Sequence, residues 1–112
     1  MNVKTLLSKP LAAWVMRQQQ KWMLQPGAIQ QSIFKKLVSK GRSTLFGAHH
    51  AFDQIKDYKD YQARVPIREY EEFLPYIEKI KRGGQHILWP GKPIYWAKTS
   101  GTTAGNKYIP IT

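Results

Sequence analysis

The chain has 112 residues and no cysteine, so it can form one small domain but no disulfide, thiolate metal site or cysteine nucleophile. Hydrophobic residues make up 42% of it, which argues against a disordered chain. The net charge is +11, and residues 1–42 hold eight Lys or Arg and no acid. Residues 43–82 balance seven bases with seven acids, and residues 83–112 hold three bases and no acid. This excess fits nucleic acid, an acidic membrane surface, an anionic ligand, or an acidic surface on a missing part of the molecule.

The sequence shows no transmembrane or secretory segment. No apolar run approaches the ~20 residues that a membrane-spanning helix needs. A secretory signal would need a longer apolar centre and a small-residue cleavage site. We therefore expect a cytoplasmic protein.

Residues 1–83 are predicted to form a helical layer, because apolar residues recur there at helical spacing. Residues 3–24 are typical of an amphipathic helix with Trp14 and Trp22 on its core-facing stripe. Pro10 would lie in the first turn, leaving the preceding residues as a separate arm. Further predicted elements are a helix over 27–40 with Gly41 as its C-cap, a loop over 43–50, a helix over 58–64 capped by Asp53 or Asp57, an extended segment over 65–67, and a helix over 68–82 that Pro75 would kink or restart.

Residues 85–112 are predicted to begin a β-structure. Ile94 to Lys98 is expected to form one strand and Lys107 to Thr112 its partner, after a turn over 90–93. A two-stranded hairpin is marginally stable alone, and the last apolar strand runs to the final residue. We therefore expect residues 1–112 to be the N-terminal part of a larger domain, with a helical layer in 1–83 and the first strands in 85–112.

A cluster of hydroxyls, glycines and one lysine separates the two predicted strands. Small residues let backbone N–H groups approach an anion, hydroxyls donate hydrogen bonds, and lysine adds a positive charge. We predict a phosphate-binding loop, with a Ser/Thr/Gly-rich hairpin turn as the alternative. The candidate ligand-binding residues are Ser100, Gly101, Thr102, Thr103, Gly105 and Lys107.

Two common phosphate motifs do not fit this loop. The P-loop needs four residues between its glycines and then Lys followed by Ser or Thr, whereas three residues separate Gly101 from Gly105, and Tyr108 follows Lys107. The Gly-x-Gly-x-x-Gly dinucleotide fingerprint is also absent.

The segment Thr99 to Lys107 resembles the phosphate loop of adenylate-forming enzymes. Its surroundings are similar to the Gretchen Hagen (auxin-responsive promoter) family of acyl acid amido synthetases, and to its bacterial branch in particular. The similar segments are Trp89-Pro90-Gly91-Lys92-Pro93, Lys107 to Ile111, Ser43 to Gly47, Asp57 to Tyr61 and Val65 to Glu71. The sequence departs from the common loop pattern at Ala104, where many such enzymes have Gly, and at Asn106, where proline is common.

This resemblance implies an α/β parent enzyme that adenylates a carboxylic acid with ATP and Mg²⁺ and passes the acyl group to an amino acid. The six loop residues would bind the ATP phosphates. The nucleotide pocket, the acidic Mg²⁺ ligand, the acyl pocket and the mobile C-terminal domain would follow this region. We therefore expect no catalytic residue and no metal ligand here, and no activity from this chain alone.

Competing functions have weaker support in the sequence. A small basic helical protein that binds nucleic acid or an anionic membrane is the alternative, but no nucleic-acid motif is present and three glutamines weaken the apolar face of the first helix. We expect neither partner. His49, His50 and His86 lack the ligand set of a zinc site and are interpreted as packing or solvated residues. The acidic side chains Glu69, Glu71, Glu72 and Glu78 are interpreted as a solvated helix face.

Overall fold

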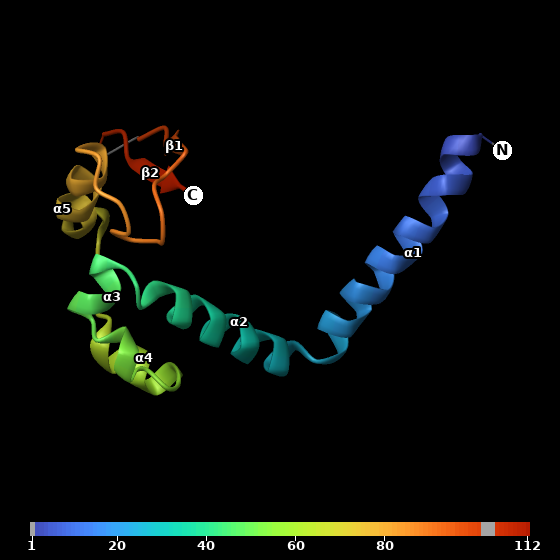
Figure 1. The fold of residues 1–112 in the computed structure, drawn as a ribbon, viewed down its shortest axis with the longest axis horizontal. Helices are drawn as coiled ribbons and strands as arrows, with labels where there is room; N and C mark the ends of the chain where they lie inside the picture. The colour runs from blue at the N-terminus through green and yellow to red at the C-terminus, as the bar shows by residue number, and fades with distance from the viewer. Residues whose placement is uncertain (1, 102–104) are drawn as a thin grey trace. The chain divides into compact units, whose positions relative to one another are not determined.

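The computed structural model describes residues 2–101 and 105–112 (Figure 1). The chain divides into two compact units, Met1–Phe34 and Lys35–Thr112. The described residues are mainly helical and end in a two-stranded antiparallel hairpin, which confirms the architecture predicted for this part of the chain.

The first unit contains helix α1, Val3–Leu24, which confirms the predicted bounds. Pro10 lies inside α1, so the prediction of a separate N-terminal arm is wrong. A proline removes only one i→i−4 hydrogen bond, and the leucines before Pro10 and the leucine and alanines after it favour helix. The core-facing assignment of the tryptophans is also wrong, because Trp14 is 59% exposed and Trp22 60% exposed. No helix among the described residues is both long and apolar enough to cross a membrane.

Helix α2, Pro26–Gly41, follows α1 after the single residue Gln25. Pro26 suits the first position of a helix, because the N–H group that it lacks would have no partner there. Gly41 is the last residue of α2, close to the predicted end. The C-terminal part of α2 belongs to the second unit and contributes Val38 to its core.

The predicted loop over 43–50 is wrong, because helix α3 spans Leu45–His49. Thr44 caps this helix by accepting a hydrogen bond from the Gly47 N–H group over 2.9 Å. Its hydroxyl also donates to the Gly41 carbonyl over 2.7 Å. The N–H groups of the first two helical residues are satisfied from a distant segment, since Leu45 donates to the His86 carbonyl and Phe46 to the Ile87 carbonyl.

Helix α4, Tyr58–Arg64, has the predicted bounds and follows the short 3₁₀ helix η1, Phe52–Gln54. Asp57 is its N-cap and accepts a hydrogen bond from the Asp60 N–H group over 2.9 Å. The backbone at Val65 is extended, as predicted for a residue that precedes proline.

Helix α5, Tyr70–Lys81, lies within the predicted range and continues through Pro75 without a break. Glu72 closes its first turn by accepting a hydrogen bond from the Glu69 N–H group over 2.9 Å. These two acidic residues therefore cap the helix and are more than a solvated face. After α5, the N–H groups of Gly83 and Gly84 donate to the Ile80 and Lys79 carbonyls, which ends the helix.

The core of the second unit gathers apolar side chains from α2, η1, α5 and the segments between them. Phe46 joins this core through ring contacts with Phe52 at 5.9 Å and with Tyr76 at 5.4 Å between centroids. The buried hydrophobic residues are Val38, Phe52, Ile55, Tyr76, Ile77 and Ile80.

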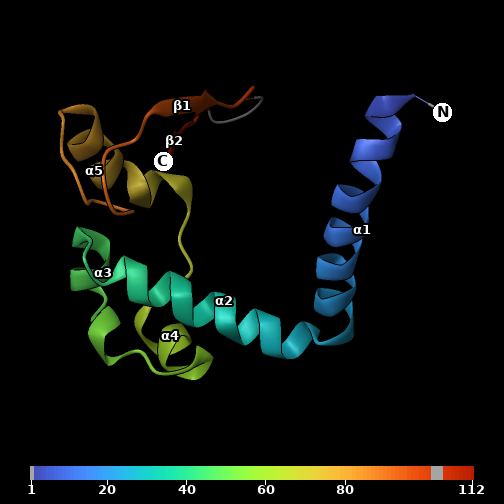
Figure 2. The same ribbon diagram turned by 45° about the vertical axis from the view of Figure 1, so that its right-hand side comes forward.

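Strands β1, Tyr95–Lys98, and β2, Tyr108–Ile111, form the hairpin. β1 begins one residue later than predicted, and β2 is one residue shorter at each end. The register pairs Tyr95 with Ile111 and Lys98 with Tyr108. Both views show the hairpin beside α5 (Figure 1, Figure 2). Helix α5 is thus the element that can hold the strands on either side of the candidate loop.

Candidate phosphate-binding loop

The hairpin brings Thr99 and Lys107 together at the base of the loop. The Thr99 N–H group donates to the Lys107 carbonyl over 2.9 Å, and the Lys107 N–H group donates to Thr99 Oγ1 over 3.2 Å. Hydrogen bonding between the two arms of the hairpin therefore continues to the residue after β1 and the residue before β2. Between these residues, the structure describes Ser100, Gly101, Gly105 and Asn106, whereas the candidate residues Thr102 and Thr103 lie outside the described residues.

The two glycines of the loop meet different backbone requirements. Gly105 has φ of +77°, in the left-handed region that favours glycine. A Cβ atom at Gly101 would collide with the carbonyl oxygen of Gly105. An ordinary side chain would therefore alter the loop at either position.

The polar groups described in the loop differ in how freely they could bind an anion. Ser100 is exposed, whereas the Gly101 N–H group donates to the Thr99 carbonyl over 3.0 Å. Lys107 is half-buried, and no carboxylate among the described residues forms an ion pair with it. The nearby segment 83–112 contains no acid. Lys107 and the Ser100 hydroxyl can thus offer a cation and a donor to an anion.

Tyr70, the first residue of α5, contacts the strand that follows Lys107. Its hydroxyl accepts a hydrogen bond from the Tyr108 N–H group over 2.8 Å and donates to the Tyr108 carbonyl over 3.0 Å. Lys107 Nζ lies 5.5 Å from the centroid of the Tyr70 ring. Tyr70 was not among the predicted site residues, because neither spacing nor composition signals a contact across 38 residues.

A second cation–aromatic contact joins the same two elements. Lys81 Nζ, at the other end of α5, lies 5.1 Å from the centroid of the Tyr108 ring. Lys81 also forms an ion pair with Glu78 over 3.0 Å. Both ends of α5 therefore contact the start of β2.

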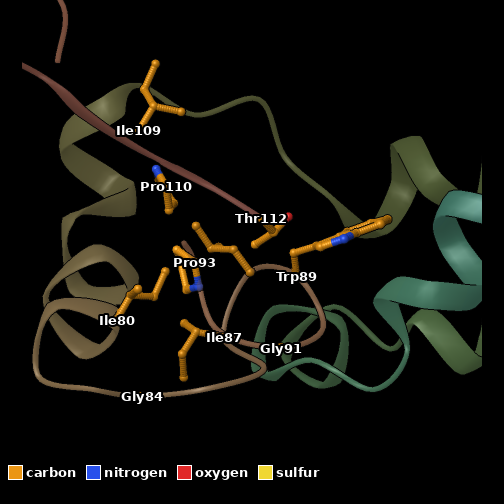
Figure 3. A pocket seen from close by; sticks show the side chains of 10 residues that line it. Ile80, Gly84, Ile87, Trp89, Gly91, Pro93, Ile109, Pro110 and Thr112 are labelled. Carbon is orange, nitrogen blue, oxygen red and sulfur yellow. The ribbon is translucent and has the colours of Figure 1, made fainter. Parts of the chain in front are cut away.

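A cavity of about 210 Å³ lies between the C-terminal end of α5, the segment 84–93 and β2. Figure 3 shows its lining side chains, which include Ile80, Ile87, Trp89, Ile109 and Pro110. These walls are mainly apolar and do not suit a phosphate group. The cavity is therefore not part of the candidate loop.

Each of the three histidines forms a hydrogen bond with another residue of the protein. His49 Nδ1 lies 2.8 Å from the Tyr76 hydroxyl, His50 Nδ1 lies 2.8 Å from the Phe46 carbonyl, and His86 Nδ1 accepts from the Gly91 N–H group over 3.0 Å. These bonds agree with packing roles. Over residues 2–101 and 105–112, no group of three His, Cys, Asp or Glu side chains could hold a metal ion.

Comparison with known proteins identifies the family. The chain is 25% identical over 85 residues to indole-3-acetic acid-amido synthetase GH3.2 of Arabidopsis thaliana, which covers 75% of the chain and 16% of that protein. It is 30% identical over 87 residues to jasmonoyl–L-amino acid synthetase JAR6 of Nicotiana attenuata, covering 76% of the chain and 15% of that protein. The chain thus spans less than one fifth of the length of these curated relatives. No solved structure shows a significant match. Residues 15–112 match the GH3 family N-terminal domain, and the chain therefore belongs to the GH3 family.

Proposed function

We propose that this chain supplies the ATP-phosphate loop of a GH3-type acyl acid amido synthetase. The observation that carries the proposal is the closed base at Thr99 and Lys107, with two backbone-constrained glycines and a lysine without a carboxylate partner among the described residues. Ser100, Gly101, Thr102, Thr103, Gly105 and Lys107 would bind the phosphates of ATP.

The chemistry of this site is electrostatic. Adenylation of a carboxylic acid releases pyrophosphate, so negative charge develops on the leaving phosphates. A lysine and short-range donors can stabilise that charge and hold the phosphates in place. The substrate carboxylate would be the attacking group, and the loop would provide no nucleophile.

Family membership supports a wider assignment as part of the same proposal. The parent enzyme would be an α/β ligase located in the cytoplasm, and it would join a small carboxylic acid to an amino acid. The names of two relatives include indole-3-acetic acid and jasmonoyl groups, which supports a small organic acid as the substrate class. Mg²⁺ would accompany ATP and neutralise its phosphates. We expect this chain by itself to bind phosphates without completing the reaction.

The direct test is titration of the 112-residue chain with tripolyphosphate, which presents the phosphate groups of ATP without the nucleoside. Loop residues such as Gly101 and Lys107 should show shifted amide resonances. Lys107→Ala should weaken binding about tenfold or more, since a charge-assisted hydrogen bond contributes about 1.5–3 kcal/mol. Lys92→Ala is the matched control, because Lys92 is an exposed lysine in the turn before β1, at the opposite end of that strand from the loop.

The catalytic part of the proposal is tested by measuring ATP–pyrophosphate exchange in the parent enzyme. Exchange should fall in Lys107→Ala and persist in Lys92→Ala. Unchanged exchange in Lys107→Ala would contradict the role of the lysine. Binding of random duplex DNA with steep salt dependence, and no binding of tripolyphosphate, would favour the nucleic-acid alternative.

A further inference from the structure

The hydroxyl of Tyr70 holds both backbone polar groups of Tyr108. A tyrosine hydroxyl can donate one hydrogen bond while accepting another, and here the two bonds measure 3.0 Å and 2.8 Å. Strand β2 pairs with β1 along one edge. On the other edge, polar groups of a strand need partners from elsewhere. Tyr70 supplies both partners at the residue directly after Lys107.

The same side chain contacts the lysine itself. The Lys107 ammonium lies 5.5 Å from the Tyr70 ring centroid, within the range of a cation–π interaction. A lysine side chain is flexible, and such a contact reduces the number of positions that its charge samples. Tyr70 therefore acts on Lys107 through the backbone of the next residue and through the ammonium group.

Tyr70 is itself well anchored. It is the first residue of α5, and the hydrogen bond from the Glu69 N–H group to Glu72 closes the turn around it. On the loop side, Thr99 holds the Lys107 backbone through two further hydrogen bonds. Lys107 thus lies between a strand contact, which binds its backbone, and a helix contact, which binds the backbone of Tyr108 and the ammonium group.

We propose that Tyr70 is a positioning residue for Lys107, setting both the strand that carries the lysine and the place of its ammonium group. The proposal rests on the proposed function, because the lysine is positioned for a phosphate. It adds a residue of α5, far from the loop in sequence, to the determinants of phosphate affinity.

The first test requires no ligand. Tyr70→Phe keeps the ring but removes both hydrogen bonds, so the Tyr108 amide should exchange with solvent at least tenfold faster. Tyr70→Leu removes the ring as well and should abolish ring-current shifts on the Lys107 side chain. Tyr95→Phe is the matched control, since Tyr95 lies in the same hairpin, is 69% exposed and pairs with Ile111. Unchanged exchange at Tyr108 in Tyr70→Phe would overturn the proposal.

The second test separates positioning from general stability. Tripolyphosphate should bind Tyr70→Phe about five- to tenfold more weakly than the unsubstituted chain, because the strand that carries the lysine loses both hydrogen bonds to the Tyr70 hydroxyl. In a Lys107→Ala background, Tyr70→Phe should have no further effect on affinity, because Tyr70 acts through that lysine. Additive effects of the two substitutions would show a merely structural role and overturn the proposal.

The outcomes also separate this proposal from the proposed function. If the unsubstituted chain binds no tripolyphosphate, the phosphate-loop function fails and the positioning role fails with it. If Lys107→Ala loses binding while Tyr70→Phe retains full affinity, only the positioning role fails. If Lys107→Ala and Tyr70→Phe each weaken binding, and the double variant binds no more weakly than Lys107→Ala, the proposed function and the positioning role are both supported.

Discussion

Arg68 Nη2 donates a hydrogen bond to His50 Nε2 over 2.9 Å. Because arginine is always a donor, Nε2 is the acceptor, and the proton of a neutral ring is on Nδ1. Nδ1 then donates to the Phe46 carbonyl over 2.8 Å. His50 is only 6% exposed, so Arg68 satisfies a nearly buried nitrogen that few water molecules could reach.

Arg68→Ala should lower the free energy of unfolding by about 1–3 kcal/mol, because it leaves His50 Nε2 buried without a donor. It also removes the guanidinium that lies 5.9 Å from the Phe46 ring centroid. Urea denaturation followed by circular dichroism measures the loss. Arg64→Ala is the control at an exposed arginine of α4, and its effect should stay within about 0.5 kcal/mol. Equal effects of the two substitutions would argue against the His50 contact.

Thr44→Val should lower the free energy of unfolding by about 2 kcal/mol. Valine keeps the shape but leaves the Gly47 N–H group and the Gly41 carbonyl without the Thr44 hydroxyl. Thr44→Ser should retain most of the stability, because serine supplies the same hydroxyl. Thermal or urea unfolding of the two variants makes the comparison. A valine variant as stable as the serine variant would show that the cap is unimportant.

Gly105→Ala and Gly101→Ala should both weaken tripolyphosphate binding, with the larger loss at Gly101. At Gly105 the cost is the strain of alanine at φ +77°, on the order of 1 kcal/mol. At Gly101 the added Cβ atom must displace the Gly105 backbone, so the base of the loop changes shape. Calorimetric titration measures both affinities. Gly27→Ala, in α2 and with free space around it, should leave affinity unchanged.

Asp57→Ala should lower the free energy of unfolding by about 1 kcal/mol, because Asp57 caps α4 through the Asp60 N–H group. Asp57→Ser should restore most of it, because serine is also a good N-cap. The sequence alone left Asp53 as an alternative cap, and Asp53→Ala should change stability by less than about 0.5 kcal/mol. Urea unfolding decides between the two aspartates, and a larger loss at Asp53 would reverse the assignment.

Local signals predicted much of the secondary structure. Asp57, one of the two caps expected for the helix over 58–64, accepts a hydrogen bond from the Asp60 N–H group only three residues away. The two apolar runs that flank the loop likewise predicted the hairpin to within one residue at either end of each strand. Such features depend on neighbours in the sequence and can be inferred without a structure.

The sequence-based predictions that were wrong concern features that depend on the rest of the fold. Helix α3 has five residues and depends on the distant carbonyls of His86 and Ile87, so its sequence resembled a loop. The spacing of Trp14 and Trp22 indicated an apolar stripe, but spacing cannot show what covers it. In the candidate loop, the contact with Tyr70 was not predicted, because it joins residues 38 positions apart.

The two hydrogen bonds from α3 to residues 86 and 87 have a consequence for the order of folding. A five-residue helix cannot persist alone, because its nucleation costs more than its few internal bonds return. Helix α3 should therefore become stable only after the chain has completed α4 and α5 and returned at His86. In pulse-labelling hydrogen exchange, the Leu45 and Phe46 amides should become protected later than the amides in the middle of α5. Their protection should begin only when the segment that contains His86 and Ile87 has docked.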